Sequence, residues 1–415
     1  MSNDRAAAPR GFVLGPNEAT MGLLAAAILL VGAVLWCSHG PNVEKTDFSL
    51  TYVGARIVHQ GLGSKLYDIN FQKQVRDSLF QHPNPLFFEH PPFEALLFSP
   101  LARLPFRTAY MIWGSVNAAV WLALMFLLRS HLPWPREDLA YICLWFLFAP
   151  VGVALFQGQS SILLLAFYAI TFIALQHEKQ FGAGIWLGLG LFKLQFVLPF
   201  AFIFLVRKKW RFVAGFTSSS LLLGVLSLAA VGWRGVVDYV HLLSNVSNNP
   251  QNLSYGSAVD MPTIYGFVHA LFGKVIGRTG LNLFVAALSL ALLVLIAWQW
   301  LSKFEGKADD LMFASAIAAS LVTGSHMFTH DFSPMLLALF LAGANSPPRP
   351  HRGLRFALAA TMVLFWLFPI YFLFVAWHCL YLMCPVLLLF AISALLASRH
   401  IKKQTSSEVQ FVVAG

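Results

Sequence analysis

The stretch LNLFVAALSLALLVLIAWQWL, residues 281–301, contains no charged side chain. Roughly 20 apolar residues in a helix span a hydrocarbon core about 30 Å thick, so this stretch is long enough to cross a membrane. Other long apolar stretches that lack charge recur between Met21 and Ser398. We therefore expect an all-α polytopic membrane protein in which many helices form one domain.

The composition excludes an ordinary soluble domain. Hydrophobic residues make up 58% of the chain and charged residues 11%, whereas soluble domains are roughly 45–50% apolar. The cysteines lie inside or at the edges of apolar stretches and lack metal-binding spacing, so we expect no disulfide framework and no cysteine metal site. They are Cys37, Cys143, Cys379 and Cys384.

The net charge of +10 does not predict a nucleic-acid partner, because the basic residues form no patch with interleaved aromatic residues. They gather at the ends of apolar stretches, at 207–211, 349–355 and 399–403, which is the positive-inside pattern. Arg5 and Arg10 precede the first apolar stretch. We therefore expect a multi-pass protein of the cell's inner membrane with both termini in the cytoplasm.

Termini on the same side require an even number of crossings, and we expect twelve. The expected catalytic domain covers 21–403, between a cytoplasmic tail at 1–20 and a flexible cytoplasmic tail at 404–415. No small-residue cleavage site follows the first apolar stretch, 21–37, so we expect a retained helix there. The other apolar stretches are 109–128, 139–156, 161–176, 182–206, 211–231, 281–301, 310–328, 333–343, 354–373 and 376–397.

Two threadings of the middle region give twelve crossings. In the first, 92–104 does not cross, and 182–206 is two half-helices broken near Lys193–Pro199. In the second, 92–104 crosses as a short span and 182–206 crosses once. Basic residues prefer the cytoplasmic side, and this preference slightly favours the first threading. It places Arg129, Arg136 and Lys179 there, against Arg103 and Arg107 in the second.

Residues 38–91 are expected to form a long first external loop. Its segments 48–60 and 67–80 carry apolar residues at helical spacing, which predicts short helices that lie in the membrane interface. Further external loops are expected at 232–262, which is rich in Asn and Ser, and at 326–332.

Asp47 lies in this first external loop, in the run TDFSLTY at 46–52. A carboxylate at the edge of a membrane helix costs free energy, so its presence predicts a functional site. The structural alternative is that Asp47 caps the helix that follows, with its side chain accepting backbone N–H groups. Its position alone supports both interpretations equally.

Four more polar motifs interrupt apolar sequence: EHPP at 89–92, QGQS at 157–160, Lys193, and SHMFTHD at 325–331. A lysine at the centre of a membrane helix costs roughly 3 kcal/mol, unless it extends to a lipid headgroup. His326 and His330 share one helix face at i,i+4, but no third ligand stands at metal spacing, and the chain has no Asp-x-Asp. We therefore expect no metal site.

One carboxylate, one or two histidines and a lysine on the external face suit glycosyl transfer from a lipid-linked sugar. The carboxylate can take the proton from an acceptor hydroxyl that attacks the anomeric carbon. A lysine or histidine can stabilise the charge on the departing phosphate. This single displacement inverts the anomeric centre. A retaining mechanism needs a second carboxylate, for which Glu44, Asp68 and Glu89 remain open.

The order of these motifs resembles glycosyltransferase family 87, a family in the GT-C group of polyprenyl-phosphate-sugar-dependent membrane enzymes. The pattern Asp47-Phe48-x-x-x-Tyr52-x-x-Ala55-Arg56, followed by Gly61 and Leu66-Tyr67-Asp68, is similar to that family's first external loop. The later motifs keep the family's order, and the resemblance covers roughly 45–340. These are His90-Pro91-Pro92-Phe93, Gly158-Gln159, Lys193-Leu194-Gln195 and His330-Asp331.

The resemblance implies a role for each matching position. Asp47 matches the catalytic base, and His330 matches a histidine of the family's mannosyltransferases. Asp331 stands where those enzymes have a second histidine, and Pro199 comes later than the family's Lys-x-x-Pro. The implied residues that bind the substrate or the donor phosphate are Lys193, His90, Gln159, Arg56, Tyr52, His326 and Asp331.

The sequence thus predicts an inverting membrane glycosyltransferase with a GT-C fold. It would move a hexose, with mannose favoured, from a polyprenyl-phosphate sugar to a lipid or glycan acceptor of the cell envelope on the non-cytoplasmic face. We expect a monomer without a cofactor. Two alternatives stay open: a transporter or lipid flippase with Lys193 and a carboxylate as a gated pair, and a non-catalytic assembly factor. A transporter would show matching broken helices in two halves, and the sequence contains no such repeat.

Overall fold

A computed structural model describes residues 43–81, 84–132, 134–135, 137–248, 258–300, 306–345 and 352–414. Within these ranges the chain forms helices joined by turns and short loops, and no described residue lies in a β-strand. The expected all-α class is therefore confirmed. The expected first membrane helix, the tail at 1–20 and Arg136 lie outside the described residues.

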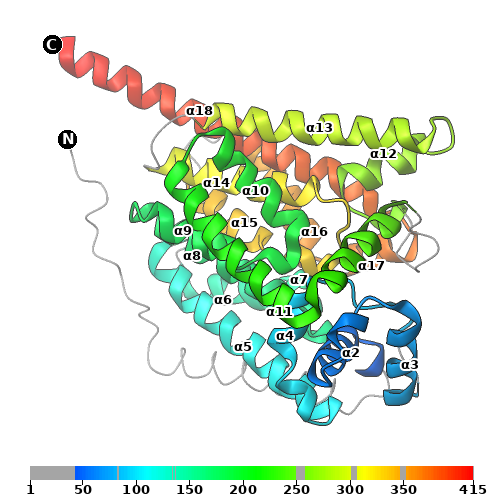
Figure 1. Cartoon of the computed structure of the whole chain (residues 1–415). Coiled ribbons are helices and arrows are strands. Elements are labelled where there is room, and N and C mark those ends of the chain that lie inside the picture. Colours follow the sequence, from blue (N-terminus) through cyan, green and yellow to red (C-terminus); the bar gives the residue numbers. More distant parts are fainter. Residues whose placement is uncertain are drawn as a thin grey trace.

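The helices follow one another along the chain as Figure 1 shows. The first group is η1 (Val43–Lys45), α2 (Phe48–His59), η2 (Gly63–Lys65), α3 (Ile69–Leu79), α4 (Pro92–Phe98) and η3 (Leu101–Arg103). The second is α5 (Phe106–His131), α6 (Asp138–Phe146), α7 (Ala149–Gln157), α8 (Ser161–Gln176), α9 (Gln180–Gly188), η4 (Leu191–Lys193), α10 (Leu194–Val206) and α11 (Trp210–Asn248). The third is η6 (Ala258–Asp260), α12 (Ile264–Phe272), α13 (Arg278–Gln299), α14 (Lys307–Val322), η7 (Thr329–Phe332), α15 (Met335–Ala344), α16 (Arg352–Trp366), α17 (Phe368–Ala376), η8 (Leu380–Leu382) and α18 (Met383–Ala414).

Four helical segments in the described part of the chain are long and apolar enough to cross a membrane. They are Phe106–His131, Trp210–Ser244, Arg278–Gln299 and Leu380–Lys402. The number rises to seven if each of three bent pairs, α6–α7, α9–α10 and α16–α17, forms one span. The described part of the chain therefore has four to seven candidate membrane spans, as expected of a polytopic membrane protein, and the figure of twelve is not confirmed.

The core of the bundle holds helices that are too short or too enclosed to count as simple spans. Residues Ala308 to Val322 of α14 are all buried, and α14 packs against α10, α15 and α18. A helix that is apolar on all sides belongs in the interior of a large bundle. The short segment α15 is likewise buried from Met335 to Ala342.

The stretch 92–104 does not cross the bundle, as in the first threading. It forms only the short helices α4 and η3, and two side chains of α2 hold its end in place. Tyr52 donates a hydrogen bond to the carbonyl of Leu104 (2.6 Å), and Arg56 donates to the carbonyl of Ala102 (2.7 Å). The long helix α5 then begins beside the first loop.

The stretch 182–206 is broken, also as in the first threading. α9 and the segment Leu191–Val206 meet at an angle of 59°. The break lies at Leu189–Lys193, slightly before the expected place, and Pro199 lies inside α10. Glycine disfavours a continuous helix; α9 ends at Gly188, and Gly190 lies within the break.

One expected loop and the expected C-terminal tail contain helix instead. α11 continues to Asn248 through a kink at Gly232 (φ 69°), so the expected external loop at 232–262 is wrong for its first half. Val236, Tyr239 and Leu242 have helical spacing and pack against the first loop, which outweighs the Asn- and Ser-rich composition. The structure also continues α18 to Ala414, where a flexible tail was expected.

The two short helices expected in the first loop are present as α2 and α3. Asp68 caps α3 by accepting from the N–H groups of Asn70 and Phe71. Gly63 lies directly on α11, because a Cβ atom there would come within 1.9 Å of the Ala230 carbonyl oxygen. The loop is therefore a packed part of the fold.

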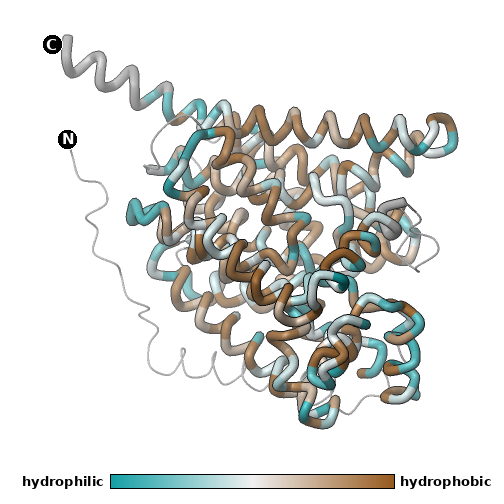
Figure 2. The backbone as a smooth tube through the Cα atoms, viewed as in Figure 1, coloured by the Kyte–Doolittle hydropathy of each residue, from teal (hydrophilic) through white to brown (hydrophobic). Residues whose placement is uncertain are grey.

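The bundle has two hydrophilic ends (Figure 2). In Figure 1, α2, α3 and α4 gather at one end, whereas α18 leaves the bundle at the opposite end. Hydrophilic segments cover both ends, and hydrophobic ones dominate the helices between them (Figure 2). Arg207 stacks on Trp300 at 4.2 Å, and Arg399 donates to Gln299 at 2.7 Å. We call the region around Arg207, Trp300, Asp309, Arg399 and Lys402 the basic end.

Candidate active site

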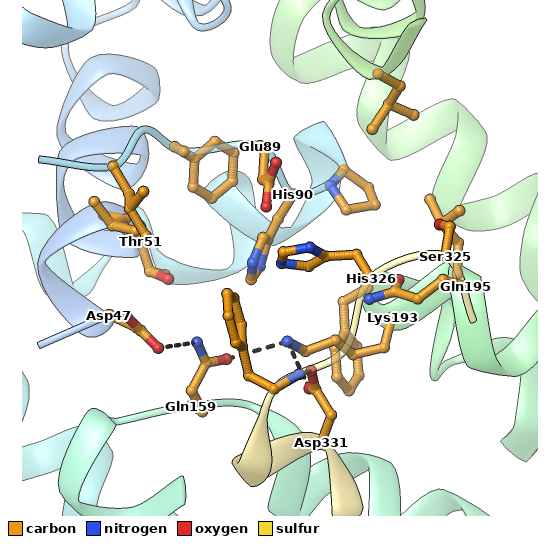
Figure 3. A pocket seen from close by; sticks show the side chains of 18 of the residues that line it. Asp47, Thr51, Glu89, His90, Gln159, Lys193, Gln195, Ser325, His326 and Asp331 are labelled. Carbon is orange, nitrogen blue, oxygen red and sulfur yellow. Dashed lines mark hydrogen bonds and ion pairs between the residues drawn. The ribbon is translucent and has the colours of Figure 1, made fainter. Parts of the chain in front are cut away.

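A cavity of about 350 Å³ lies at the end of the bundle that carries the first loop. Segments far apart in the sequence meet there, including α2, the 86–91 segment, the 159 turn, η4 and η7. Figure 3 shows their polar side chains around one space. The charged and polar residues in its wall include Asp47, Glu89, His90, Gln159, Lys193, Gln195, Ser325, His326, His330 and Asp331.

Asp47 lies directly before α2 but does not cap it, because its side chain accepts no backbone N–H of that helix. Its Oδ2 accepts a hydrogen bond from Gln159 Nε2 at 2.8 Å, and its Oδ1 lies 3.4 Å from Asn84 Nδ2. The Asp47 side chain is 21% exposed. The cap interpretation is therefore wrong, and the carboxylate is presented to the cavity.

Lys193 points into the bundle and not toward a lipid headgroup. Its Nζ lies 3.0 Å from Asp331 Oδ1 and 3.3 Å from Gln159 Oε1. The side chain is 6% exposed. A buried ammonium needs a carboxylate and hydrogen bonds to offset its lost hydration, and both are present here. Figure 3 shows the resulting chain of contacts from Asp47 through Gln159 and Lys193 to Asp331.

Asp331 is almost fully enclosed, with 1% of its side chain exposed. Burial alone would raise the pKa of its carboxyl group, but His330, Lys193 and the Phe328 N–H together hold this pKa below its ordinary value. The carboxylate therefore carries a negative charge at neutral pH. Asp331 therefore holds the Lys193 ammonium in place.

His330 stands between the two carboxylates. Its Nδ1 is 3.9 Å from Asp47 Oδ2, too long for a hydrogen bond, and its Nε2 is 3.4 Å from Asp331 Oδ1. Burial lowers the pKa of His330 and also that of His326. Both imidazoles are therefore neutral at neutral pH, so each ring can donate one hydrogen bond and accept another.

His90 differs from these two histidines. Its Nδ1 lies 2.7 Å from Glu94 Oε2. Enclosure alone would lower the pKa of His90, but the Glu94 charge and hydrogen bond outweigh this and raise the pKa above its ordinary value. The wall thus holds one imidazole that favours the cationic form.

The turn at 157–161 contacts most of these groups. Gln157 Oε1 accepts from the Asp47 backbone N–H at 3.0 Å, and Gln159 bridges Asp47 and Lys193. Ser160 donates to Glu94 at 3.0 Å, and Ser161 donates to Asp331 at 3.2 Å.

Gly158 allows this turn to approach α2. Its backbone is left-handed (φ 63°), and a Cβ atom would come within 2.8 Å of the Phe48 Cβ. Its carbonyl accepts from Trp113 Nε1 at 2.8 Å. Glycine is the residue that suits both the positive φ and the close contact.

Two residues that the resemblance implied for phosphate binding lie elsewhere. The hydrogen bonds of Tyr52 and Arg56 go to backbone carbonyls of the 102–104 segment, and neither residue lines the cavity. The structure therefore does not bring them together with Lys193. The remaining residues expected at the site, Asp47, His90, Gln159, Lys193, His326, His330 and Asp331, all line the cavity.

Sequence reasoning missed Glu94, Ser161 and Asn84, and it named Ser160 only as part of the QGQS motif, without a role. The i,i+4 spacing of His90 and Glu94 at a helix start was a signal that could have identified Glu94. Of the carboxylates left open for a retaining mechanism, Asp68 caps α3 and Glu44 accepts from the Gln81 N–H. Only Glu89 among these three lines the cavity.

Within the described residues, no group of three or more His, Cys, Asp or Glu side chains could hold a metal ion. His326 and His330 both line the cavity without a third ligand that would complete such a group.

A family model for glycosyltransferase family 87 matches residues 87–329. The chain belongs to glycosyltransferase family 87. No curated protein and no solved structure matches it. This family 87 member is therefore a membrane glycosyltransferase. The matched region contains His90, Gln159, Lys193 and His326. His330 lies one residue after its end and Asp47 lies 40 residues before its start, and both also line the cavity.

Proposed function

We propose that this family 87 enzyme transfers a hexose, most favourably mannose, from a polyprenyl-phosphate sugar to a lipid or glycan acceptor with inversion. The observation that carries the proposal is the pairing of Asp47 and Lys193 through Gln159 in one cavity. A base and a phosphate-binding cation must stand on either side of a sugar for a direct displacement. Gln159 contacts both Asp47 and Lys193 and so fixes the distance between the base and the cation.

In the proposed reaction, the acceptor hydroxyl oxygen forms a bond to the anomeric carbon while the bond from that carbon to the phosphate oxygen breaks. Asp47 takes the hydroxyl proton. The phosphate leaves with the electron pair, and the Lys193 ammonium stabilises its charge. Neutral His330, 3.9 Å from Asp47, is placed to hydrogen-bond the acceptor and orient it. Metal and other cofactors have no part in this scheme.

The inverting course is favoured because Asp47 alone suffices for it, whereas a retaining course needs a second carboxylate as nucleophile. Of the three carboxylates left open for that role, Glu89 lines the cavity, and the configuration of the product decides whether it takes part. Asp68 and Glu44 are held by backbone N–H groups. Asp47 is held by side-chain amides and has its surface on the cavity. Family membership favours glycosyl transfer over the transporter and assembly-factor alternatives.

The proposed orientation places the cavity on the non-cytoplasmic face of the inner membrane and both termini in the cytoplasm. Support comes from the basic end, which lies opposite the first loop in Figure 1. Basic residues favour the cytoplasmic side. Lipid-linked donors and cell-envelope acceptors are then available to a monomer from the outer leaflet.

The test is transfer by the purified full-length protein from a panel of polyprenyl-phosphate hexoses to membrane lipid extracts. Mass spectrometry of the products identifies the sugar and acceptor, and NMR coupling constants report the anomeric configuration. We expect one donor, the mannosyl compound, to give an inverted product. Transfer from nucleotide sugars alone, or a product with retained configuration, would contradict the proposal.

A further inference from the structure

A second buried carboxylate lies behind the cavity wall. Glu94, in the first turn of α4, is 2% exposed, and its Oε2 lies 2.7 Å from His90 Nδ1. Its Oε1 accepts a hydrogen bond from Ser160 Oγ at 3.0 Å. The mechanism above assigns no role to Glu94 or Ser160.

The local fold fixes the direction in which His90 faces. Pro91 and Pro92 start α4, which places Glu94 one helical turn after His90. Tyr67 donates its hydroxyl hydrogen to the His90 carbonyl at 2.7 Å. With the backbone and Nδ1 both held, the imidazole extends into the cavity, as Figure 3 shows.

The charged groups around His90 come from several elements. Glu94 approaches from α4, Glu89 from the adjacent residue, Lys193 from η4 and His326 from the turn before η7. The Glu94 and Glu89 charges favour the imidazolium, whereas Lys193 opposes it. Glu94 is the charged group in direct contact with the ring, 2.7 Å from Nδ1, so it stabilises the cation most directly.

We propose that Glu94 is a positioning residue that holds His90 as an imidazolium facing the cavity, so that His90 and Lys193 together bind the donor phosphate. The inference rests on the proposed function because the phosphate is that of the lipid-linked sugar. It adds a second cation and the residue that maintains its charge.

Lys193 and His90 are held in the same way, each by a buried carboxylate that also accepts from a serine. Lys193 is backed by Asp331, which accepts from Ser161, and His90 is backed by Glu94, which accepts from Ser160. The side chains of both carboxylates are at most 2% exposed. Each pair therefore presents its positive end to the cavity, which is the arrangement that favours an anion there.

The test measures the affinity of undecaprenyl phosphate for the full-length protein in detergent at about pH 5.5 and about pH 7.5, on either side of the ordinary histidine pKa of about 6.5. Glu94→Gln keeps the shape of the side chain and removes its charge. We expect its affinity relative to the unchanged protein to fall about tenfold at the higher pH, the effect of one charge-assisted hydrogen bond. The deficit should shrink at the lower pH as His90 gains its proton.

The relative affinity at each pH removes the titration of the lipid phosphate itself from the comparison. His90→Ala should lose affinity without the pH-dependent recovery, and Glu137→Gln, at an exposed position, should bind like the unchanged protein. Glu94→Gln should also raise the KM for the lipid-linked donor more than it lowers kcat. Equal affinity of Glu94→Gln and the unchanged protein at both pH values would overturn the proposal. A deficit that does not change with pH would also overturn it, since it would indicate a structural role alone.

Asp47→Asn separates this inference from the proposed function. It should bind undecaprenyl phosphate normally and fail to transfer sugar. If Asp47→Asn transferred sugar normally, the base assignment would fail while the Glu94 result stood. If the unchanged protein bound no undecaprenyl phosphate at either pH, the donor-phosphate site itself would be overturned.

Discussion

Each end of the bundle buries a carboxylate beside a lysine, but the lysine is much more exposed at one end than at the other. At the basic end, Asp309 accepts from Trp300 Nε1 at 3.0 Å and lies 3.5 Å from Lys402 Nζ. The Lys402 side chain is 32% exposed. At the cavity, Asp331 lies 3.0 Å from Lys193, whose side chain is 6% exposed.

The difference shows what each pair contributes. Lys402 is partly exposed, so it depends less on its carboxylate than Lys193 does, although Asp309 itself is 1% exposed. Lys193 has given up most of its water and depends on Asp331 and Gln159. Burying a charge in this way rarely improves stability by itself. The cavity pair therefore serves to hold a cation in a fixed place for a ligand.

Among these substitutions, Asp47→Asn should have the largest effect on activity, because it removes the proposed base and leaves both lysine–carboxylate pairs intact. Turnover should fall by about 10³-fold, the size expected for loss of a general base, with an unchanged melting temperature. Asp77→Asn is the control, since that carboxylate is 48% exposed and pairs with Arg76. Near-normal turnover of Asp47→Asn would show that another group removes the proton.

Lys193→Met and Lys402→Met compare the two pairs directly. Lys193→Met leaves Asp331 charged and buried, which should cost about 3–5 kcal/mol of folding free energy. Lys402→Met also leaves a buried carboxylate, but Asp309 keeps its hydrogen bond from Trp300 and the nearby Arg207 charge, so this substitution should cost less than Lys193→Met. Thermal melts in detergent measure both. Equal losses of folding free energy would mean that the exposure of the lysine does not determine how much its pair contributes.

His330→Ala should lower turnover by about 10- to 100-fold, less than Asp47→Asn, because His330 orients the acceptor and takes no proton in the scheme. Since burial lowers the pKa of His330, the unchanged protein should lose this contribution only when the pH falls below the ordinary histidine value of about 6.5. His378→Ala, whose side chain is 74% exposed, is the control. Unchanged kinetics of His330→Ala would assign the residue to packing alone.

Arg56→Lys should have the smallest effect. Its hydrogen bond to the Ala102 carbonyl anchors the 92–104 segment outside both charged regions, and its loss should cost about 1 kcal/mol. The KM for the donor should stay unchanged. A clear rise in this KM would place Arg56 at the phosphate after all.

The sequence was sufficient to predict the helical class, the helices of the first loop and the break before α10. Apolar length and spacing carry this information, because they depend on neighbours in the chain. The extent of α11 was missed because Val236, Tyr239 and Leu242 have a partner surface only when the first loop folds against them. The sequence did not give the number of membrane spans, because two other kinds of segment are as apolar as a spanning helix. These are helix pairs bent at a short break and short buried helices such as α14.

The sequence predicted which residues line the site better than it predicted what each of them does. Motif order identified Asp47, Lys193 and His330, all of which line the cavity. It also named Tyr52 and Arg56, because one helix face cannot be told from another before the packing of α2 is known. The roles of Glu94 and Asp331 as supports for cations depend on contacts across the fold that no local pattern contains.

The turn at 157–161 has a consequence for the genetics of this enzyme. One short segment contacts Asp47, Lys193, Asp331 and Glu94, so substitutions at these four positions disturb the same support. Effects of residues that share partners do not add. A double-mutant cycle between Asp47 and Glu94 measures this coupling through the turn, although they are 47 positions apart in the sequence. Natural variation at the four positions should then be correlated, with the turn itself changing least.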